Sequence, residues 1–235
     1  VAHMHGAGEH AEIGEELRQS VWLAVALTLV AVALFAYPEP FLAVAKVEPA
    51  LEAKVRAYLH ALAWSLPAAL LFRVFYSFST AISRPRTVMA LTLIGLALKV
   101  PLNWVFMYGN LGAPELGSTG CAVATTLIAW ITCVLAWAWC WFEPGYQPYQ
   151  VFARWSWPNA KALGRILSLG LPIGLTFFID VTGFTFMALF IARLGALYSA
   201  AHQIASNLAA LAFMLPLALG NAASVVVGQS LGARQ

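Results

Sequence analysis

Asp180 is the side chain in this sequence most able to do chemistry, because it stands inside a long apolar stretch that runs from Ser168 to Ile191. It is the only aspartate of the chain, and every other acidic residue is a glutamate outside the apolar stretches or at their edges. A carboxylate at membrane depth is unfavourable unless it meets a cation, a proton or a polar partner. We therefore interpret Asp180 as an ion, proton or substrate site. The alternative is a structural carboxylate that a neighbouring hydroxyl or backbone donor satisfies.

Aromatic and hydroxyl side chains share one helical face with Asp180. Thr176, Phe177 and Phe184 lie three or four residues from it, and this spacing places residues on the same side of a helix. A carboxylate between aromatic rings is suited to an organic cation, which is attracted by the charge and by the ring faces. Ordinary helix packing is the simpler explanation for the rings alone, so they enter only as candidate lining of a substrate cavity.

The last apolar stretch carries amides that extend this candidate cavity. Gln203, Asn207 and Met214 fall near one line along a helix of 3.6 residues per turn. Amide side chains on a membrane helix are expected to face protein or water and not lipid.

A second polar group lies earlier in the chain. Lys99 is inside an apolar stretch, about 20 Å of helix from Arg86, and Asn103 follows it by one turn. Thr125 adds a hydroxyl to the next stretch. At such depth a lysine needs a partner or a water-filled cavity.

The composition fixes the class of protein that must position these residues. The chain is 61% hydrophobic and only 10% charged, whereas about a quarter of the residues of a soluble domain are charged. Several apolar stretches reach the roughly 20 residues that a helix needs to cross a bilayer. We predict an all-α polytopic membrane protein with six transmembrane helices, listed as approximate ranges: Ser20–Tyr37, Ala57–Ala81, Thr87–Tyr108, Thr119–Phe142, Gly164–Leu194 and Tyr198–Gly228.

Prolines interrupt four of these six predicted spans, at Pro67, Pro101, Pro172 and Pro216. Each removes one helix hydrogen bond, and such breaks indicate helices that bend during transport, although proline is also simply more common in membrane helices.

The positions of Lys and Arg predict the orientation. One side of the membrane receives seven of them, Arg18, Arg84, Arg86, Arg154, Lys161, Arg165 and Arg234, and the other receives four, Lys46, Lys54, Arg56 and Arg193. Because cytoplasmic loops carry the excess of basic residues, both ends of the chain are expected in the cytoplasm. The basic residues form no patch for nucleic acid.

The two ends of the sequence also resemble each other. Val1, Gly6 and Ala7 recur at Val227, Gly232 and Ala233, an offset of 226 residues. Repeated halves are common in transporters, whose sites form between them. We interpret the chain as the back of one repeat joined to the front of the next.

Other chemistry is not indicated. His3, His5 and His10 are expected to be solvated, and His60 and His202 lack metal-ligand spacing. The three cysteines fall in one helix and are interpreted as packing residues. No nucleophile constellation and no phosphate-binding loop is found, which disfavours a membrane-embedded enzyme.

Several motifs resemble the multidrug and toxic compound extrusion (MATE) family, NorM branch. They are Gly170-Leu-Pro-Ile with Asp180-Val, Ala200-Ala-His-Gln-Ile, Gly220-Asn-Ala-Ala-Ser with Val227-Gly-Gln, Val100-Pro-Leu-Asn-Trp, Gly112-Ala-Pro-Glu-Leu-Gly and Gly120-Cys-Ala-Val-Ala-Thr. The resemblance covers essentially the whole chain in order. It implies helices three to eight of a twelve-helix antiporter with two lobes, divided here at 1–142 (N-lobe with a cytoplasmic lead-in), 143–163 (inter-lobe loop) and 164–235 (C-lobe).

The resemblance also implies roles for individual residues. Asp180 falls where the family carries the cation-binding acid of its seventh helix, with Na+ or H+ as the coupling ion and no cofactor. Asn103 and Thr125 fall where related members build a site in the first lobe, and Lys99 replaces an Asn of that pattern. The implied function is export of small cationic, lipophilic drugs through the inner membrane by a monomer. A lipid-linked saccharide flippase of the same superfamily is the alternative, and it would show more cationic residues lining its cavity.

Overall fold

The computed structural model describes residues 1–37, 49–109, 117–151 and 156–234, and within them every regular element is a helix. Five helices are long and apolar enough to cross a membrane: α2 (His10–Ala36), α6 (Pro85–Tyr108), α7 (Ser118–Phe142), α8 (Ala160–Ala192) and α9 (Ala196–Gly232). Helices α4 (Pro49–Ala63) and α5 (Leu66–Ala81) meet at a bend of 41° and together make a sixth span. The predicted all-α membrane architecture is confirmed.

Residues with special backbone preferences set the ends of the helices. Pro85 opens α6, where its missing N–H is not needed, and Gly109 ends this helix with a φ of 68°. The side chain of Asn159 caps α8 by accepting a hydrogen bond of 3.0 Å from the backbone N–H of Lys161. Gly195, with a φ of 113°, makes the tight turn between α8 and α9.

The bend between α4 and α5 is satisfied by side chains of α7. Pro67 stands in the first turn of α5 and contributes no N–H to the helix ladder. The hydroxyl of Thr126 donates to the carbonyl of Ala61 at 2.8 Å, and the indole of Trp130 donates to the carbonyl of Trp64 at 2.9 Å. Carbonyls freed at a break inside a membrane need such donors, so α7 holds the bent span in place.

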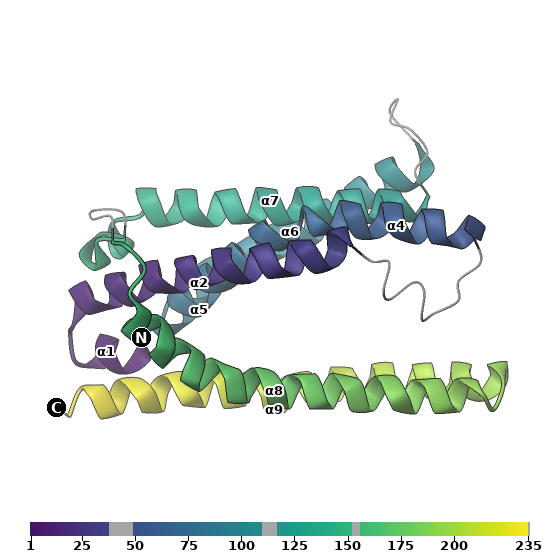
Figure 1. The fold of residues 1–235 in the computed structure, drawn as a ribbon. Coiled ribbons are helices and arrows are strands. Elements are labelled where there is room, and N and C mark those ends of the chain that lie inside the picture. Colours follow the sequence, from purple (N-terminus) through teal and green to yellow (C-terminus); the bar gives the residue numbers. More distant parts are fainter. Residues whose placement is uncertain (38–48, 110–116, 152–155, 235) are drawn as a thin grey trace.

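The helices form two groups that diverge from one end of the molecule. We call α2, α4, α5, α6 and α7 the four-span bundle, and α8 with α9 the α8–α9 pair. Both chain termini lie at the same end, which we call the terminal end, and the turn between α8 and α9 lies at the opposite, far end (Figure 1). The pair lies close to the bundle at the terminal end and separates from it toward the far end.

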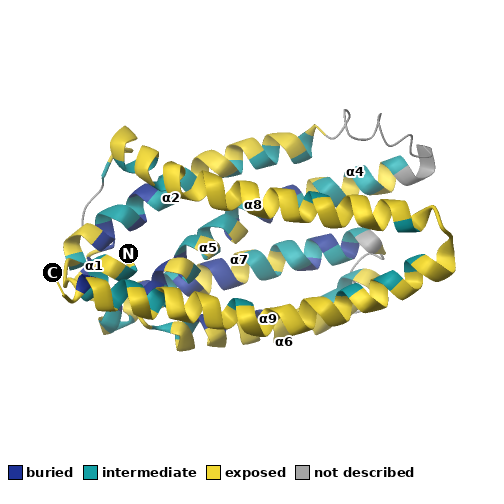
Figure 2. Ribbon diagram, turned by 90° about the horizontal axis from the view of Figure 1, so that it is seen from below, coloured by how far each residue is buried: buried dark blue, intermediate teal, exposed yellow. Residues whose placement is uncertain are grey.

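The buried core belongs to the bundle and is richest near the terminal end. It gathers Phe75 and Phe78 of α5, Ile13 of α2, Leu91 of α6 and Tyr146 of the short helix η2 (Pro144–Tyr149). Figure 2 shows buried residues on the bundle helices, while α8 and α9 are exposed along almost their whole length. The pair therefore presents apolar faces that the described residues do not cover.

Two predicted boundaries differ from the structure. The polar lead-in before Ser20 is helical, because α1 (Ala2–Gly6) forms there and α2 already begins at His10. Residues 49–56, which precede the predicted second span at Ala57, are the start of α4, and this helix continues without interruption into that span. Amphipathic helices of this kind carry Glu and Lys at a helical period and so resemble loops when only hydropathy is followed. Residues 38–48, 110–116 and 152–155 lie outside the described residues, and with them Lys46 and Arg154 of the orientation argument.

Candidate transport site and the contact at the terminal end

Asp180 lies far along α8, about 30 Å of helix from Ala160, and its side chain is exposed. Thr176, Phe177 and Phe184 on the neighbouring turns are exposed as well. The hydroxyl of Thr176 donates to the carbonyl of Pro172 at 3.0 Å, which leaves its oxygen lone pairs free to accept. This part of α8 thus offers a carboxylate, a hydroxyl oxygen and two rings on the surface of the helix.

The amides of α9 come to the same depth as Asp180. Asp180 lies 14 residues before Leu194 in the turn, and Leu208 lies 14 residues after it. Because both helices rise equally per residue, Asn207 stands level with Asp180, about 21 Å of helix from the turn. Gln203 and Met214 lie one turn nearer to the far end and about two turns nearer to the terminal end, and all three side chains are exposed.

The polar group of the bundle lies between α6 and α7. A Cβ on Gly95 would lie 3.0 Å from Thr132 Cγ2, and one on Gly120 would meet the Phe106 carbonyl. This antiparallel register places Asn103 opposite residues 123–125, at the depth of Thr125.

The two polar residues at that depth differ in how they are satisfied. The hydroxyl of Thr125 donates to the carbonyl of Cys121 in its own helix at 2.8 Å. The Oδ1 atom of Asn103 is buried and has no hydrogen-bond partner among the described residues. Lys99, one turn closer to the terminal end, is exposed. Asn103 therefore has an unused acceptor beside Thr125, while the ammonium of Lys99 points away from the buried interface of α6.

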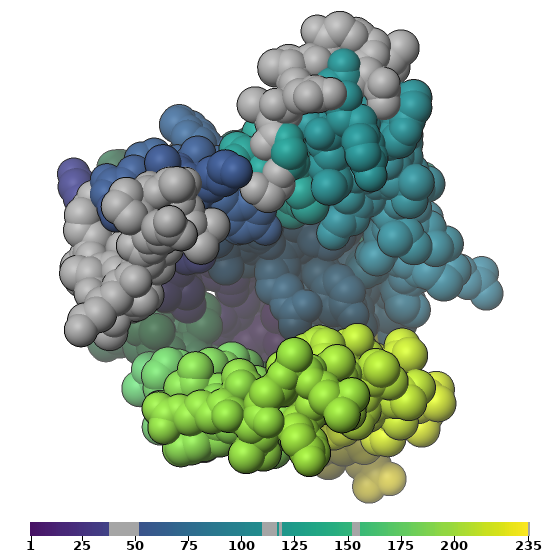
Figure 3. Space-filling view, turned by 90° about the vertical axis from the view of Figure 1, so that its right-hand side faces the viewer, coloured from purple at the N-terminus to yellow at the C-terminus, as the bar shows by residue number. Residues whose placement is uncertain are grey.

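The α8–α9 residues and the α6–α7 residues do not meet in the described part of the chain. A view from the far end shows a hollow between the pair and the bundle (Figure 3). Asp180 makes no ion pair with Lys99 among the residues that the structure describes, where the salt bridges lie elsewhere. The structure thus separates the two groups of polar residues, one on the α8–α9 pair and one on α6 and α7.

An open pocket of about 500 Å³ on α4 was not anticipated from the sequence. Glu52, Arg56 and His60 line it, and Glu52 and Arg56 form a salt bridge of 3.1 Å. Both charged side chains are two-fifths exposed, so their attraction is screened by solvent. No group of three potential metal ligands occurs among the described residues.

At the terminal end, α1 and the end of α9 touch through glycines. A Cβ on Gly232 would lie 1.9 Å from the carbonyl oxygen of His3, and a Cβ on Gly6 would lie 2.0 Å from the carbonyl oxygen of Gln229. Only glycine allows two helix backbones to approach this closely. Both chain ends, and α1 beside the end of α9, are visible at the left of Figure 1.

The side chain of Gln229 connects α9 to the bundle at the same place. Its Nε2 atom donates to the carbonyl of Ala81 at 2.7 Å and lies 2.9 Å from the hydroxyl oxygen of Ser83. Ser83, with a φ of 61°, forms the turn between α5 and α6. The amide therefore bridges this turn, whereas the likeness between the two chain ends identifies only the neighbouring glycines, Gly6 and Gly232.

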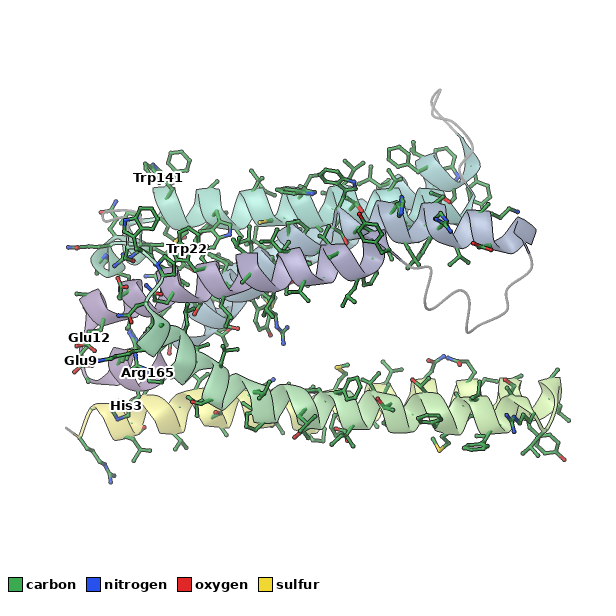
Figure 4. The ribbon with its side chains drawn as sticks, viewed as in Figure 1. His3, Glu9, Glu12, Trp22, Trp141 and Arg165 are labelled. Carbon is green, nitrogen blue, oxygen red and sulfur yellow. The ribbon has the colours of Figure 1, made fainter. Side chains whose placement is uncertain are left out.

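Charged residues surround this contact. His3, Glu9, Glu12 and Arg165 gather at the terminal end (Figure 4), and Arg165 of α8 forms an ion pair with Glu16 of α2. This pair is a second link between the α8–α9 pair and the bundle.

The expectation that His5 and His10 are solvated is wrong. His5 Nδ1 lies 3.0 Å from the hydroxyl of Tyr149, and the His10 ring packs edge-on against Tyr149 at 5.1 Å. Burial, and next the neighbouring His10, lower the pKa of His5. Burial likewise raises the pKa of Tyr149. The residues pack because α1 folds back onto η2, which hydropathy does not reveal.

Six apolar spans arranged as a bundle and a separate pair, with polar side chains at membrane depth, define a multi-pass helical membrane protein. The chain belongs to the MatE family, whose model matches residues 1–105 and 172–235. It is 43% identical over 235 residues to the probable multidrug resistance protein NorM of Aromatoleum aromaticum, of which it covers 51%.

Comparison with solved structures supports the same family assignment. The chain is similar to the MATE transporter NorM-NG in complex with R6G and monobody, with 29% identity, a TM-score of 0.74, and coverage of 99% of this chain and 51% of that one. It also shares the fold of the eukaryotic MATE transporter AtDTX14, with a TM-score of 0.83 at 18% identity and coverage of 99% of this chain and 51% of that one. The chain spans about half the length of these relatives. Because they are transport and multidrug resistance proteins, the membrane-embedded enzyme is not supported.

Proposed function

We propose that this chain is part of a cation-coupled antiporter that exports small, lipophilic, cationic compounds through the inner membrane. The observation that carries the proposal is Asp180, the lone carboxylate at membrane depth on α8, which stands level with Asn207 of α9. In this role the carboxylate binds either the coupling ion, Na+ or H+, or the cationic substrate, and the two compete for one charge.

The arrangement of the helices supports a division into lobes. Residues 1–142 belong to one lobe, residues 143–163 connect, and residues 164–235 begin the other. Substrate would pass through the hollow between the bundle and the α8–α9 pair, beside Thr176, Phe177 and Phe184 on α8 and Gln203, Asn207 and Met214 on α9. The aromatic rings would attract the cationic part of a substrate and the apolar surface its lipophilic part.

The terminal end is assigned to the cytoplasm. Arg18, Arg84 and Arg165 lie there, in contacts with Glu15, Glu143 and Glu16. An excess of Arg and Lys marks the cytoplasmic side of a membrane protein. The far end, where the pair and the bundle separate, then opens to the outside.

The polar residues of the bundle, Lys99, Asn103 and Thr125, have a supporting role in this proposal. Asn103 and Thr125 offer oxygen atoms that could accept from a solute, but the fixed charge of Lys99 disfavours a cation beside them. Asp180 is accordingly the principal coupling site, and the first-lobe residues adjust substrate preference.

The test uses everted vesicles from cells that express the complete reading frame containing this chain. Dye efflux is driven by an imposed Na+ gradient or, separately, an imposed H+ gradient, which identifies the ion. The Asp180→Asn variant, similar in size but uncharged, should lose coupled efflux at normal expression. The Asp180→Glu variant is the matched control, and it should retain a large part of the activity because it keeps the charge. Efflux by Asp180→Asn at the wild-type rate would contradict the assignment.

A further inference from the structure

The contact between α1 and α9 involves equivalent residues on its two sides, because their numbers differ by 226, the offset that relates the two chain ends. Gly6 meets the carbonyl of Gln229, and Gly232 meets the carbonyl of His3. Adding 226 to residues 3 and 6 gives 229 and 232, so the two contacts are the same contact seen from each side. The backbone nitrogens nearby obey the same rule, because an ideal Cβ on Gly6 would lie 3.0 Å from the N of Ala233 and one on Gly232 would lie 3.1 Å from the N of Ala7. The offset is therefore a spatial pseudo-two-fold relation between α1 and α9.

Each partner in this contact is anchored to a different part of the molecule. On the side away from α9, α1 is held by the bundle, since Met4 packs against the buried core and His5 contacts the Tyr149 hydroxyl at 3.0 Å. On its own side, α9 continues to the turn with α8. The glycine contact thus joins the bundle to the α8–α9 pair, at the end of the molecule where the two groups are close together.

The chemistry of the contact allows it to separate. The glycine faces meet backbone to backbone, and the side chain recorded against Gly228 is the single methyl group of Ala2, so parting them leaves little to reorganise. Within the α1–α9 contact the polar closure comes from Gln229, whose amide bonds the Ala81 carbonyl and contacts Ser83. The Arg165–Glu16 ion pair is a further polar link between the two groups at this end. In water, these groups can exchange their partners for solvent at little net change in free energy.

We infer that the Gly6–Gly232 contact, with Gln229 as its latch, is the gate that closes the terminal end of the transporter and that must part when this end opens. The inference rests on the proposed function, because a gate has meaning only if a solute crosses. It adds the residues whose contact separates the closed from the open state, and it predicts that the two glycines are equivalent.

The first experiment measures opening without transport. The complete protein is prepared with its native cysteines replaced and with Ala2→Cys as the reporter, since Ala2 is half-buried and its Cβ lies against the backbone of α9 at Gly228, where an added Cβ would lie only 3.2 Å away. A membrane-impermeant maleimide is applied to the side on which the terminal end lies. Gly6→Ala and Gly232→Ala should each accelerate labelling about tenfold, and to a similar extent, because overpacking of backbone against backbone disfavours the closed state.

The control is Gly120→Ala, whose new Cβ would lie 2.2 Å from the Phe106 carbonyl inside the bundle. The clash is as severe, but α6 and α7 stay together in both states, so thermal stability should fall while labelling of the reporter stays at the starting rate. If the glycine variants fold poorly, Gln229→Met removes the latch without a clash and should also accelerate labelling. Unchanged labelling in all three variants would overturn the inference.

The second experiment locks the contact. The Ala2→Cys/Gly228→Cys pair brings two Cβ atoms close to the roughly 3.5–4.5 Å that a disulfide requires. Oxidation should abolish efflux and reduction should restore it. A Gly95→Cys/Thr132→Cys pair, which joins α6 to α7 inside the bundle, should transport equally in both redox states. Full efflux by the oxidised gate pair would show that the contact is static. If no substrate is exported by any form and labelling still responds to the glycine variants, the proposed function fails, while the separation of the α1–α9 contact is still demonstrated.

Discussion

The bend between α4 and α5 predicts that two adjacent threonines of α7 have separable roles. At the bend, the N–H of Ser65 turns to the carbonyl of Leu62 at 2.8 Å, so the carbonyl of Ala61 loses its usual helix donor. The hydroxyl of Thr126 supplies the replacement at 2.8 Å from a neighbouring helix. The hydroxyl of Thr125 bonds only a carbonyl of its own helix, that of Cys121. Replacing Thr126 by Val, which preserves the shape, should therefore destabilise the protein.

The magnitude follows from what remains unsatisfied. A hydrogen bond between membrane helices stabilises by about 0.6 kcal/mol on average, whereas a carbonyl left without a donor in a buried site costs about 1–3 kcal/mol. The Thr126 hydroxyl has one proton, which it shares between Ala61 and the Ala122 carbonyl 2.9 Å away. We therefore expect the Thr126→Val variant to lose about 1–2 kcal/mol, which corresponds to about 1–4 °C in the unfolding midpoint of a complete protein as long as the relatives, of which this chain spans 51%. Thr125→Val exposes no new carbonyl and should change the midpoint by less than about 1 °C.

The assay is thermal unfolding of the complete, detergent-solubilised protein, with efflux measured in parallel on the same preparations. Thr126→Val should lower the midpoint and leave the substrate profile unchanged. Thr125→Val should leave the midpoint unchanged and alter the substrate profile, because Thr125 lies at the depth of Asn103. Equal midpoints for the two variants would refute the role of α7 in supporting the bend.

Two further predictions concern ionisable groups. The folded state holds the pKa of His5 below its ordinary value, so folding favours the neutral ring, and stability is lost as the pH falls below about 6.5. Labelling of the Ala2→Cys reporter, divided by the rate for free cysteine at the same pH because maleimide reacts with the thiolate, should accelerate over that range. The His5→Phe variant should remove this acceleration. Lys99→Asn in an Asp180→Asn background should create a Na+ site that calorimetry detects, because it removes the fixed positive charge near Asn103. An altered drug profile without any gain in Na+ binding would show that Lys99 only adjusts substrate choice.

The sequence predicts the spans because hydropathy and helix-end residues are local properties. The third predicted span begins within two residues of α6, since Pro85 and Gly109 mark its two ends. The fourth begins within one residue of α7. Rare polar residues inside apolar stretches are equally local, so Asp180 and Asn103 could be identified from the sequence alone. Whether these residues bind an ion stays a prediction.

Partners that come from distant parts of the chain could not be predicted in this way. Tyr149 holds His5 across 144 residues, and Thr126 supports Ala61 across 65. Neither histidine spacing nor threonine hydropathy carries that information, because both contacts depend on how η2 and α7 pack. The same limitation applied to the N-terminal residues, whose polarity indicated a solvated lead-in although they form α1 and the start of α2.

The likeness of the two chain ends is intermediate between the local features, which could be predicted, and the distant contacts, which could not. The sequence shows the repeated residues, but it does not show that they contact each other. Three identities in eight positions are weak evidence for a repeat. In the structure, the repeated pair is Gly6 and Gly232, the two positions at which any Cβ would enter the backbone of the other helix. In a contact with two-fold symmetry the two helices use the same surface, so a position that must be small on one helix must also be small on the other. The likeness therefore persists where symmetry demands it, while Gln229 and His3, which are also related by the offset, differ as a latch on one side and an exposed side chain on the other. That difference predicts an asymmetric gate, in which substitution of Gln229 opens the terminal end and substitution of His3 does not.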